Sequence, residues 1–230
     1  MADIEDTHDS HTVAPRVLLV GGSPETCGPE LLKRLSDECE LVVAVDRGLD
    51  SIIDAGLACD LFCGDADSVG SLGQASVRRC EAGEPSEVRD VERYDPYKDF
   101  TDLALALRAI RSRWGAVELV CTCLTGGRPD HALAAIGCLL RWDGAIRLEE
   151  DGFSGRLLKE GMTWRMTGRE GSTFSFVCLS PVAVVSELGM EWELDRKRVE
   201  LLSDLGISNV VTSDARVVCH EGAIAAYLIR

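Results

Sequence analysis

Two aspartates one residue apart follow an apolar run in the segment LFCGDADSVG, which spans residues 61–70. Placing Asp65 and Asp67 at the end of a buried strand is costly unless a cation compensates their charge. Hard oxygen ligands favour Mg²⁺, which in proteins usually bridges carboxylates and substrate phosphates. The alternative is an ordinary turn in which both carboxylates are solvated. The segment alone leaves both interpretations open.

A second group of ionisable residues occurs in the segment KDFTD, at the start of a predicted helix. Lys98 and Asp102 are four positions apart, and Asp99 and Asp102 are three apart, so they can share a helix face. A lysine beside carboxylates can neutralise one oxygen of a transferring phosphoryl group while a metal holds another. The alternative is that Asp99 or Thr101 caps the helix, Asp102 favours the helix dipole and Lys98 is solvated.

A third group lies in the segment LTGGRPDH, between a predicted strand and a predicted helix. Gly126 and Gly127 allow the backbone to approach a phosphate, the helix offers N–H groups, and the guanidinium of Arg128 matches phosphate geometry. Asp130 and His131 then fall in the first helical turn, where an acid is favourable and the histidine can be an ordinary partly buried residue. No GxxxxGK[ST] sequence occurs, which excludes an ordinary P-loop.

The elements that must position these residues alternate between strand and helix over the first ~145 residues. The runs RVLLV, LVVAV, LFCG and VELVCT are strand-like, and most lead into segments with helical spacing. The interval between Ser68 and Val91 is rich in turn formers and charges. Alternation of this kind predicts a parallel sheet covered on both faces, in which ligands bind at the carboxyl ends of the strands. Asp46, the aspartate pair and Thr125 therefore converge on one edge.

The pattern changes from about Gly152 onward, where short β-type runs are separated by Gly, Ser and charged turns. We expect a disordered tail over residues 1–14, an α/β nucleotide-binding catalytic domain over 15–148, and an all-β sandwich domain over 149–230. The segment ELDRKRVELLSDLG within the second domain is compatible with a helix and is left unassigned.

The composition disfavours several classes of protein. The 230 residues carry 24 Lys and Arg against 39 Asp and Glu, a net charge of −15, which disfavours nucleic-acid and anionic-membrane partners. No apolar stretch approaches the ~20 residues that span a bilayer, and residues 1–14 lack the features of a signal peptide. The ten cysteines form no CxxC pair and lie mostly in apolar segments, which predicts reduced thiols and a cytoplasmic protein.

Four segments in order over residues 16–143 resemble the thiamine pyrophosphokinase family, which carries ADGGA-like, GDxDS, KDxTD and TGGRxDH segments. They stand here as VDRGLD, GDADS, KDFTD and TGGRPDH. A looser resemblance places the family's Ser-Asn segment at GISN, which contains Ser208 and Asn209.

The resemblance implies an N-terminal α/β domain, a C-terminal β-sandwich and a homodimer. It also implies transfer of the pyrophosphoryl group of ATP to thiamine with Mg²⁺, giving thiamine diphosphate and AMP. By this analogy the catalytic residues are Asp65, Asp67, Lys98 and Asp102, of which the three aspartates lie near the metal. Thiamine would contact Ser208 and Asn209 of the partner subunit. The residues on the ATP side would be Asp46, Arg47, Gly48, Ser68, Thr101, Thr125, Gly126, Gly127, Arg128, Asp130 and His131.

One segment departs from the family pattern. Arg47-Gly48 stands where the family has Gly-Gly, and Leu49-Asp50 replaces a small residue and an amide. Arg47 either adds a phosphate contact or crowds the site. Two alternatives remain: a pyrophosphokinase for another hydroxymethyl heterocycle such as a pterin, and a non-catalytic thiamine- or nucleotide-binding sensor. A site for cationic thiamine should combine aromatic or acidic walls with few basic groups, whereas a neutral pterin needs amide and carboxylate hydrogen-bonding edges.

Overall fold

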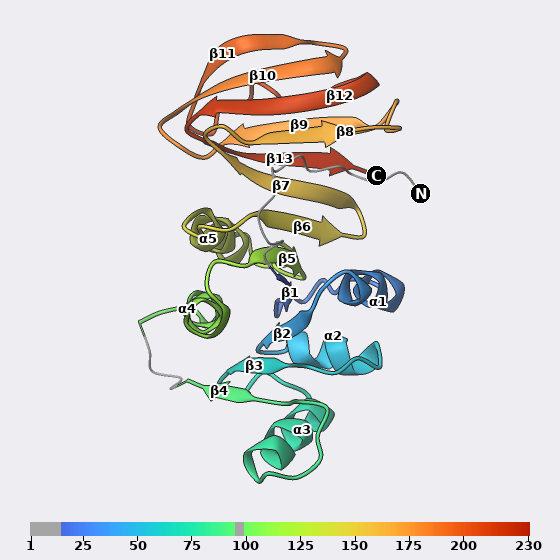
Figure 1. Ribbon diagram of the computed structural model, residues 1–230, viewed down its shortest axis with the longest axis vertical. Helices are drawn as coiled ribbons and strands as arrows, with labels where there is room; N and C mark the ends of the chain where they lie inside the picture. Colours follow the sequence, from blue (N-terminus) through green and yellow to red (C-terminus); the bar gives the residue numbers. More distant parts are fainter. Residues whose placement is uncertain (1–14, 95–98) are drawn as a thin grey trace. The chain divides into compact units, whose positions relative to one another are not determined.

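The computed structural model describes residues 15–94 and 99–230 (Figure 1). The predicted tail, residues 1–14, and the candidate catalytic residue Lys98 lie outside the described residues. The chain divides into two compact units, of which the first ends at Asp151 and the second begins at Gly152. The sequence predicted a change of structure after residue 148.

The first unit is built on a parallel sheet, as the sequence predicted. Its strand order is β4-β3-β2-β1-β5-β6, and every neighbouring pair is parallel. The central strand β1 is flanked by β2 and β5, and the side chains of residues 17–20 are fully buried. Continuous apolar runs of this kind suit strands that are covered on both faces. The strands are β1 (Arg16–Val20), β2 (Leu41–Val45), β3 (Leu61–Gly64), β4 (Val91–Arg93), β5 (Glu118–Thr122) and β6 (Ile146–Glu150).

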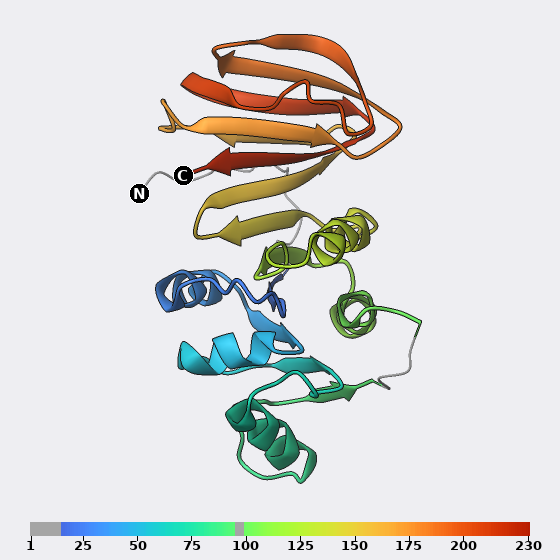
Figure 2. The ribbon, with the colours of Figure 1, turned by 180° about the vertical axis from the view of Figure 1, so that it is seen from behind.

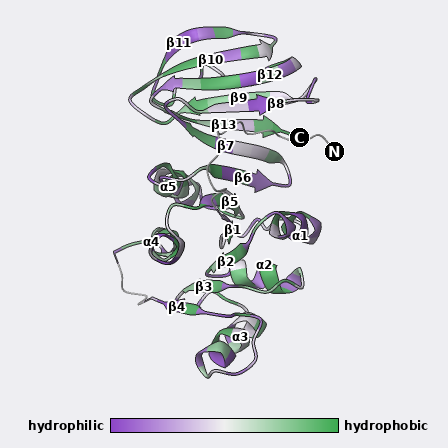
Figure 3. Cartoon of the chain, viewed as in Figure 1, coloured by the Kyte–Doolittle hydropathy of each residue, from purple (hydrophilic) through white to green (hydrophobic). Residues whose placement is uncertain are grey.

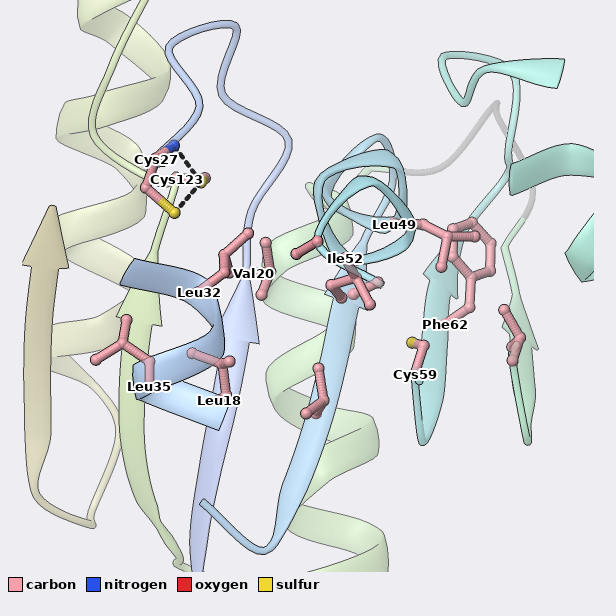
Figure 4. Packing of buried hydrophobic residues seen from close by; sticks show 14 of the residues in the cluster. Leu18, Val20, Cys27, Leu32, Leu35, Leu49, Ile52, Cys59, Phe62 and Cys123 are labelled. Atoms are coloured by element: carbon pink, nitrogen blue, oxygen red, sulfur yellow. Dashed lines mark hydrogen bonds between the residues drawn. The ribbon is translucent and has the colours of Figure 1, made fainter. Parts of the chain in front are cut away.

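Helices cover both faces of this sheet. α1 (Pro29–Asp37) and α2 (Gly48–Asp54) lie on one face, whereas α4 (Asp102–Trp114) and α5 (Pro129–Leu140) lie on the other (Figures 1 and 2). Leu32 and Leu35 of α1 lie beside Val20 and Leu18 of β1, whereas Leu49 of α2 lies beside Phe62 of β3 (Figure 4). None of the helices in the described ranges is long and apolar enough to cross a membrane.

The interval from Ser68 to Val91 contains a helix, α3 (Ser71–Glu81), that the sequence analysis missed. Its buried residues include Gly73, Ser76 and Val77, whereas Leu72 is 69% exposed, so the helix lacks an apolar stripe that periodicity could detect. Its N-terminus is held from outside the helix. The Gly70 N–H donates to both carboxylate oxygens of Asp50, at 2.9 and 3.1 Å, which caps α3 and places an acid at its positive end.

The second unit is an antiparallel β structure, which confirms the all-β prediction. One layer contains β9-β13-β7 and the other contains β11-β10-β12 with β8 beside β12, and β12 joins the layers because Asn209 and Val210 pair with β9. The core between them includes Phe174, Phe176 and Trp164. The strands are β7 (Phe153–Lys159), β8 (Thr163–Met166), β9 (Thr173–Cys178), β10 (Val182–Met190), β11 (Leu194–Glu200), β12 (Asn209–Glu221) and β13 (Ala223–Ile229).

The helix-compatible segment ELDRKRVELLSDLG is not a helix. Leu194–Glu200 forms the edge strand β11, which pairs antiparallel with β10, and residues 201–208 form turns. β11 is mostly hydrophilic, with Val199 as its buried residue (Figure 3). Charged residues are common on edge strands because they discourage pairing with other chains. Pairing with β10 therefore overrides the local helical pattern.

Gly48 provides a test of how α2 meets the sheet. A Cβ on Gly48 would overlap the Val20 carbonyl oxygen and lie 2.8 Å from the Gly21 carbonyl oxygen, and neither backbone group can move freely. We expect Gly48→Ala to lower the free energy of unfolding by about 1–3 kcal/mol. Gly137→Ala in α5 is the matched control, because a Cβ there meets nothing within 4 Å and alanine favours a helix. Urea unfolding of both variants measures the difference, and equal midpoints would contradict the proposed clash.

Candidate active site

The loops after β1 and β5 run side by side at the carboxyl edge of the parallel sheet. The Gly21 N–H donates to the Thr122 carbonyl oxygen and the Ser23 N–H to that of Cys123, both at 2.9 Å. Further out, the Gly127 N–H donates to Glu25 Oε1 at 3.2 Å. The loop that contains Thr125, Gly126 and Gly127 is therefore positioned by the loop after β1.

Asp46 follows β2 and lies against the end of β3. Its backbone φ is +48°, a left-handed conformation that aspartate adopts more readily than most residues. Its Oδ1 occupies the place where a Cβ on residue 64 would stand, so this position must be glycine. Asp46 is thus placed beside the peptide that leads into Asp65.

Three predicted carboxylates are brought together. The Asp67 N–H donates to Asp65 Oδ1 at 3.0 Å, and the two carboxyl groups contact each other. The pKa of Asp67 is raised because the Asp65 carboxyl group lies beside it, and the charge of Asp102 at the start of α4 adds to the effect. Arg93 donates to the Asp65 carbonyl oxygen and fixes the backbone there. Two ionised carboxyl groups in contact repel one another, and a cation beside them would relieve that repulsion.

The donor set fits a divalent ion that also takes water and substrate ligands. Within residues 15–94 and 99–230, no group of three or more His, Cys, Asp or Glu side chains forms a ready metal site. Mg²⁺ commonly binds one or two carboxylates and completes its coordination with waters and phosphate oxygens. Asp65 and Asp67 suit that role, with Asp102 close by. Assignment of Mg²⁺ to these aspartates stays a prediction.

The start of α4 shows how a motif residue can serve the fold. Thr101 is the N-cap residue, and its hydroxyl oxygen accepts a hydrogen bond from the Ala104 N–H at 3.2 Å. Asp99 is exposed, and Asp102 is the first helical residue and is half-buried. Ser68, in the turn after Asp67, is exposed. The capping interpretation therefore applies to Thr101, whereas Asp102 belongs to the carboxylate cluster.

Arg128 and Asp130 form a two-pronged ion pair at the start of α5. Arg128 Nε donates to Asp130 Oδ1 at 3.1 Å and an Nη donates to Oδ2 at 2.5 Å. The guanidinium lowers the pKa of Asp130 to about 2. Both side chains are exposed, at 70% and 62%, and His131 beside them is also exposed. A phosphate that binds Arg128 must compete with Asp130 for the same donors.

Arg47 and Gly48 at the start of α2 have different environments. Arg47 is exposed, and its aliphatic stem lies over the loop after β1, since a Cβ built on Gly22 would be 3.1 Å from Arg47 Cγ. Gly48 is buried against the Val20 carbonyl oxygen, so its identity is set by packing.

Two thiols and a carboxyl group lie beneath these loops. Cys27 and Cys123 have their sulfur atoms 3.6 Å apart, and the Cys27 N–H donates to Cys123 Sγ at 3.3 Å (Figure 4). Glu150 accepts hydrogen bonds from the Thr122 hydroxyl and the Leu124 N–H, at 3.2 and 3.4 Å, and burial raises its pKa. These contacts connect the start of α1 and the end of β6 to the loop after β5.

A pocket in the second unit contains Asn209 and a set of residues that the sequence analysis did not single out. Trp192, which is 60% exposed, forms an aromatic wall, and Glu187 and Asp204 supply acidic groups. Its aliphatic lining residues are Leu194, Leu205 and Ile207. No lysine or arginine is found among the described residues that line it.

The amide of Asn209 is fully engaged by the protein. Its Nδ2 donates to the Trp192 carbonyl oxygen at 2.8 Å and to Glu187 Oε2 at 3.1 Å. Its Oδ1 accepts from the Trp192 and Val210 N–H groups, at 3.1 and 2.9 Å. Asn209 is 3% exposed, so its geometry suits positioning of Trp192 more than direct contact with a ligand. Ser208 is exposed on the preceding turn with φ +59°.

The missed residues differ in the signal they gave. Glu187 lies in the apolar run VAVVSEL, and an acid inside a buried strand carries the same desolvation cost that drew attention to Asp65 and Asp67. Trp192 gave no comparable signal, because an aromatic residue in a β-rich segment is ordinary core material. Its exposure became apparent only from the fold.

Two family models match the chain. The model described as "Thiamin pyrophosphokinase, catalytic domain" matches residues 32–148, and "Thiamin pyrophosphokinase, vitamin B1 binding domain" matches residues 160–224. A curated relative, the thiamine pyrophosphokinase of Bacillus subtilis (strain 168), is 33% identical over 124 residues. That alignment covers 54% of this chain and 53% of the relative, so the matched part spans about half of the relative's length.

Solved structures support the same fold. A crystal structure of thiamine pyrophosphokinase from Bacillus subtilis superposes with a TM-score of 0.77 at 23% identity, covering 93% of this chain and 98% of that one. A thiamin pyrophosphokinase from Candida albicans gives a TM-score of 0.75 at 16% identity, covering 94% and 90%. The catalytic-domain model covers more than half of the sequence and the second model covers most of the β unit, so the chain belongs to the thiamin pyrophosphokinase family.

Proposed function

We propose that this protein transfers the pyrophosphoryl group of Mg²⁺-ATP to thiamine, giving thiamine diphosphate and AMP. The hydroxyl oxygen of thiamine forms a bond to the β-phosphorus as the bond from that phosphorus to the AMP oxygen breaks, and the hydroxyl proton is released. Phosphoryl transfer of this kind needs little covalent help from a protein, and catalysis rests on positioning and on neutralising charge. Family membership and the carboxylate cluster of Asp65, Asp67 and Asp102 support this reaction class.

On the nucleotide side, the carboxylates would hold the metal and the loops would hold the phosphates. Bound Mg²⁺ neutralises charge on the phosphate oxygens and orients them. Asp65 and Asp67 would hold the ion from the end of β3, and Lys98 and Arg128 would contact the phosphates. Because Arg128 is paired with Asp130, we infer that nucleotide binding exchanges one anionic partner of the guanidinium for another.

The lining of the pocket in the second unit is the observation that carries the identity of the acceptor. It combines Trp192 with two acids, and the described lining contains no basic side chain. A cationic aromatic ring is attracted both by an indole face and by nearby carboxylates. A neutral pterin would need free amide edges, yet the amide of Asn209 is already used by Trp192, Val210 and Glu187. Thiamine fits this lining better than a pterin.

We further infer a homodimer in which the acceptor pocket of one protomer serves the phosphate site of its partner. Each unit supplies one half of the chemistry, since the carboxylate cluster lies in the first and the aromatic, acidic pocket in the second. A cytoplasmic location suits the ten cysteines, all of which are free thiols, because reducing compartments maintain that state.

The direct test of the function is AMP release from Mg²⁺-ATP with thiamine, with a hydroxymethylpterin and with no acceptor. We expect AMP to accumulate only in the reaction that contains thiamine as the acceptor, together with an equal amount of thiamine diphosphate. Release of AMP with the pterin alone would assign the other pyrophosphokinase activity. Thiamine binding without release of AMP in any reaction would favour a sensor.

Asp67→Asn tests the carboxylate cluster. Loss of one charged contact to the reacting phosphates is expected to lower kcat about 100-fold or more and to raise the Mg²⁺ concentration that gives half-maximal rate. Asp54→Asn, an exposed aspartate at the end of α2, is the matched control and should keep the wild-type rate. A wild-type rate in the Asp67 variant, with unchanged circular dichroism, would remove Asp67 from the site.

Mixing two defective variants tests the composite dimer. Asp67→Asn removes the phosphate side and Trp192→Ala the acceptor side, and Trp192 is suited to this because it is 60% exposed. If sites form between protomers, a heterodimer has one intact site, and a mixture should recover up to about a quarter of the wild-type activity. If each site lies within one chain, every combination stays defective. Native mass spectrometry must show that the mixture has exchanged subunits.

A further inference from the structure

Glu187 is a buried acid whose carboxyl group is only half satisfied. Its side chain is 1% exposed, and Oε2 accepts a hydrogen bond from Asn209 Nδ2 at 3.1 Å. Oε1 is buried and has no hydrogen-bond partner among the residues that the structure describes. Burying a carboxyl group in this way is costly, and an unsatisfied buried polar atom in a native fold calls for a functional or structural reason.

The hydrogen bonds of Asn209 join Glu187 to the aromatic wall of the pocket. The same Nδ2 that donates to Glu187 also donates to the Trp192 carbonyl oxygen, and Oδ1 accepts from the Trp192 N–H. Glu187 and Trp192 both line the pocket. The carboxyl group of Glu187 and the backbone of Trp192 are therefore held together by a residue that contributes no charge of its own.

Among the described residues that pair with Glu187 or line the pocket, none is a cation. Opposite Glu187, β11 presents Leu194 and β12 presents Val217, and neither is ionisable. The turn over residues 201–208 contributes Asp204, which is also an acid. The basic residue next to Val217 on β12 is Arg216, which is exposed and alternates to the other side of the strand. Further along the strands, the His220 ring bonds the Ser186 hydroxyl at 2.8 Å and Arg196 at 3.1 Å.

We infer that Glu187 determines the charge preference of the acceptor pocket, selecting a positively charged heteroaromatic ring over a neutral ring of the same shape. The inference rests on the proposed function, because it assigns that pocket to the acceptor. A buried carboxylate attracts a nearby cation more strongly than an exposed acid does, and an indole in the same lining adds to the attraction. The missing counter-ion is then supplied by the acceptor itself.

Ionisation of Glu187 falls in the neutral range, which makes the preference dependent on pH. Burial raises the pKa of Glu187 from 4.5 to about 7. The pocket thus gains its charge as the pH rises through neutrality. The positive charge of the thiazolium ring lies on a quaternary nitrogen and does not titrate in this range, so the charge of the ring stays constant while that of Glu187 changes.

A purely structural role for Glu187 can be separated from a role for its charge. In Glu187→Gln the side chain keeps an oxygen that can accept the hydrogen bond from Asn209 Nδ2, so the link to Trp192 survives while the charge is lost. The matched control is Glu191→Gln, which removes an exposed acid next to Trp192 that does not line the pocket.

The experiment measures KM for thiamine and kcat in both variants and in the wild type, from about pH 6 to about pH 8.5. At the upper end of this pH range we expect E187Q to raise the KM for thiamine about tenfold and to leave kcat nearly unchanged. One opposite charge at short range shifts the equilibrium of a titrating group by about the same factor. The wild-type KM should fall as the pH rises, whereas that of E187Q should stay flat. E191Q should follow the wild type.

Two further readouts distinguish charge from structure. A competitive inhibitor in which a neutral benzene ring replaces the thiazolium should bind the wild type and E187Q equally. The thermal midpoint of E187Q should exceed that of the wild type at about pH 8, and the difference should shrink toward about pH 5. The reason is that folding penalises the ionised form of a glutamate whose pKa is raised, so the wild type loses stability as the pH rises through this range.

The outcomes are separable. Suppose that the wild type releases AMP in the presence of thiamine, and that the KM of E187Q for thiamine is within about twofold of the wild-type KM with the same pH profile. That result overturns the inference and leaves the proposed function standing. A fall of kcat and of the thermal midpoint in E187Q without a selective change of KM assigns a structural role and also overturns it. A wild-type protein that releases no AMP with thiamine overturns the proposed function and the inference together.

Discussion

The parallel pairing of β1 with β2 and β5 brings the loop that contains Asp46 and the loop that contains Thr125 to the same edge of the sheet. Val20, Val45 and Thr122 end neighbouring strands, and the chain then turns outward at the same edge of the sheet. The loops after these strands hold one another through backbone hydrogen bonds, and buried thiols and Glu150 support them from below. A slip in this register would separate the aspartates from the loop that contains Gly126 and Gly127. The apolar packing that sets the register therefore also sets the geometry of the candidate site.

Both units contain an acid whose pKa is raised. In the first unit the carboxyl groups of Asp65 and Asp67 lie in contact, and the pKa of Asp67 is raised. In the second unit Glu187 is buried without a cation beside it. Each arrangement favours a bound state that brings positive charge, which in the proposed function is a divalent ion in one case and a cationic acceptor in the other. The net charge of −15 is therefore partly a property of the sites.

The sequence predicted those features that depend on local pattern and on strand ends. Apolar runs predicted the parallel strands, and the cost of burying acids drew attention to Asp65 and Asp67. It missed α3, whose buried residues are small, and it left β11 unassigned because only pairing with β10 makes that charged segment a strand. The pocket around Trp192 could not be predicted, since it is assembled from β10, β12 and turns that are distant in sequence. The periodicity of apolar residues predicts local elements, but it does not predict contacts between segments that are distant in sequence.

The segment RGLD shows how the fold limits which residues of a motif are free to serve chemistry. Gly48 is required because a side chain would overlap the Val20 carbonyl oxygen, and Asp50 is occupied with the N-terminus of α3. Leu49 is fully buried in the core. Arg47 is the exposed member, and its stem lies over the loop after β1. The other three positions are therefore fixed by packing and capping contacts, and a departure from the family pattern at Arg47 can add a cation near the loop after β1 without disturbing the fold.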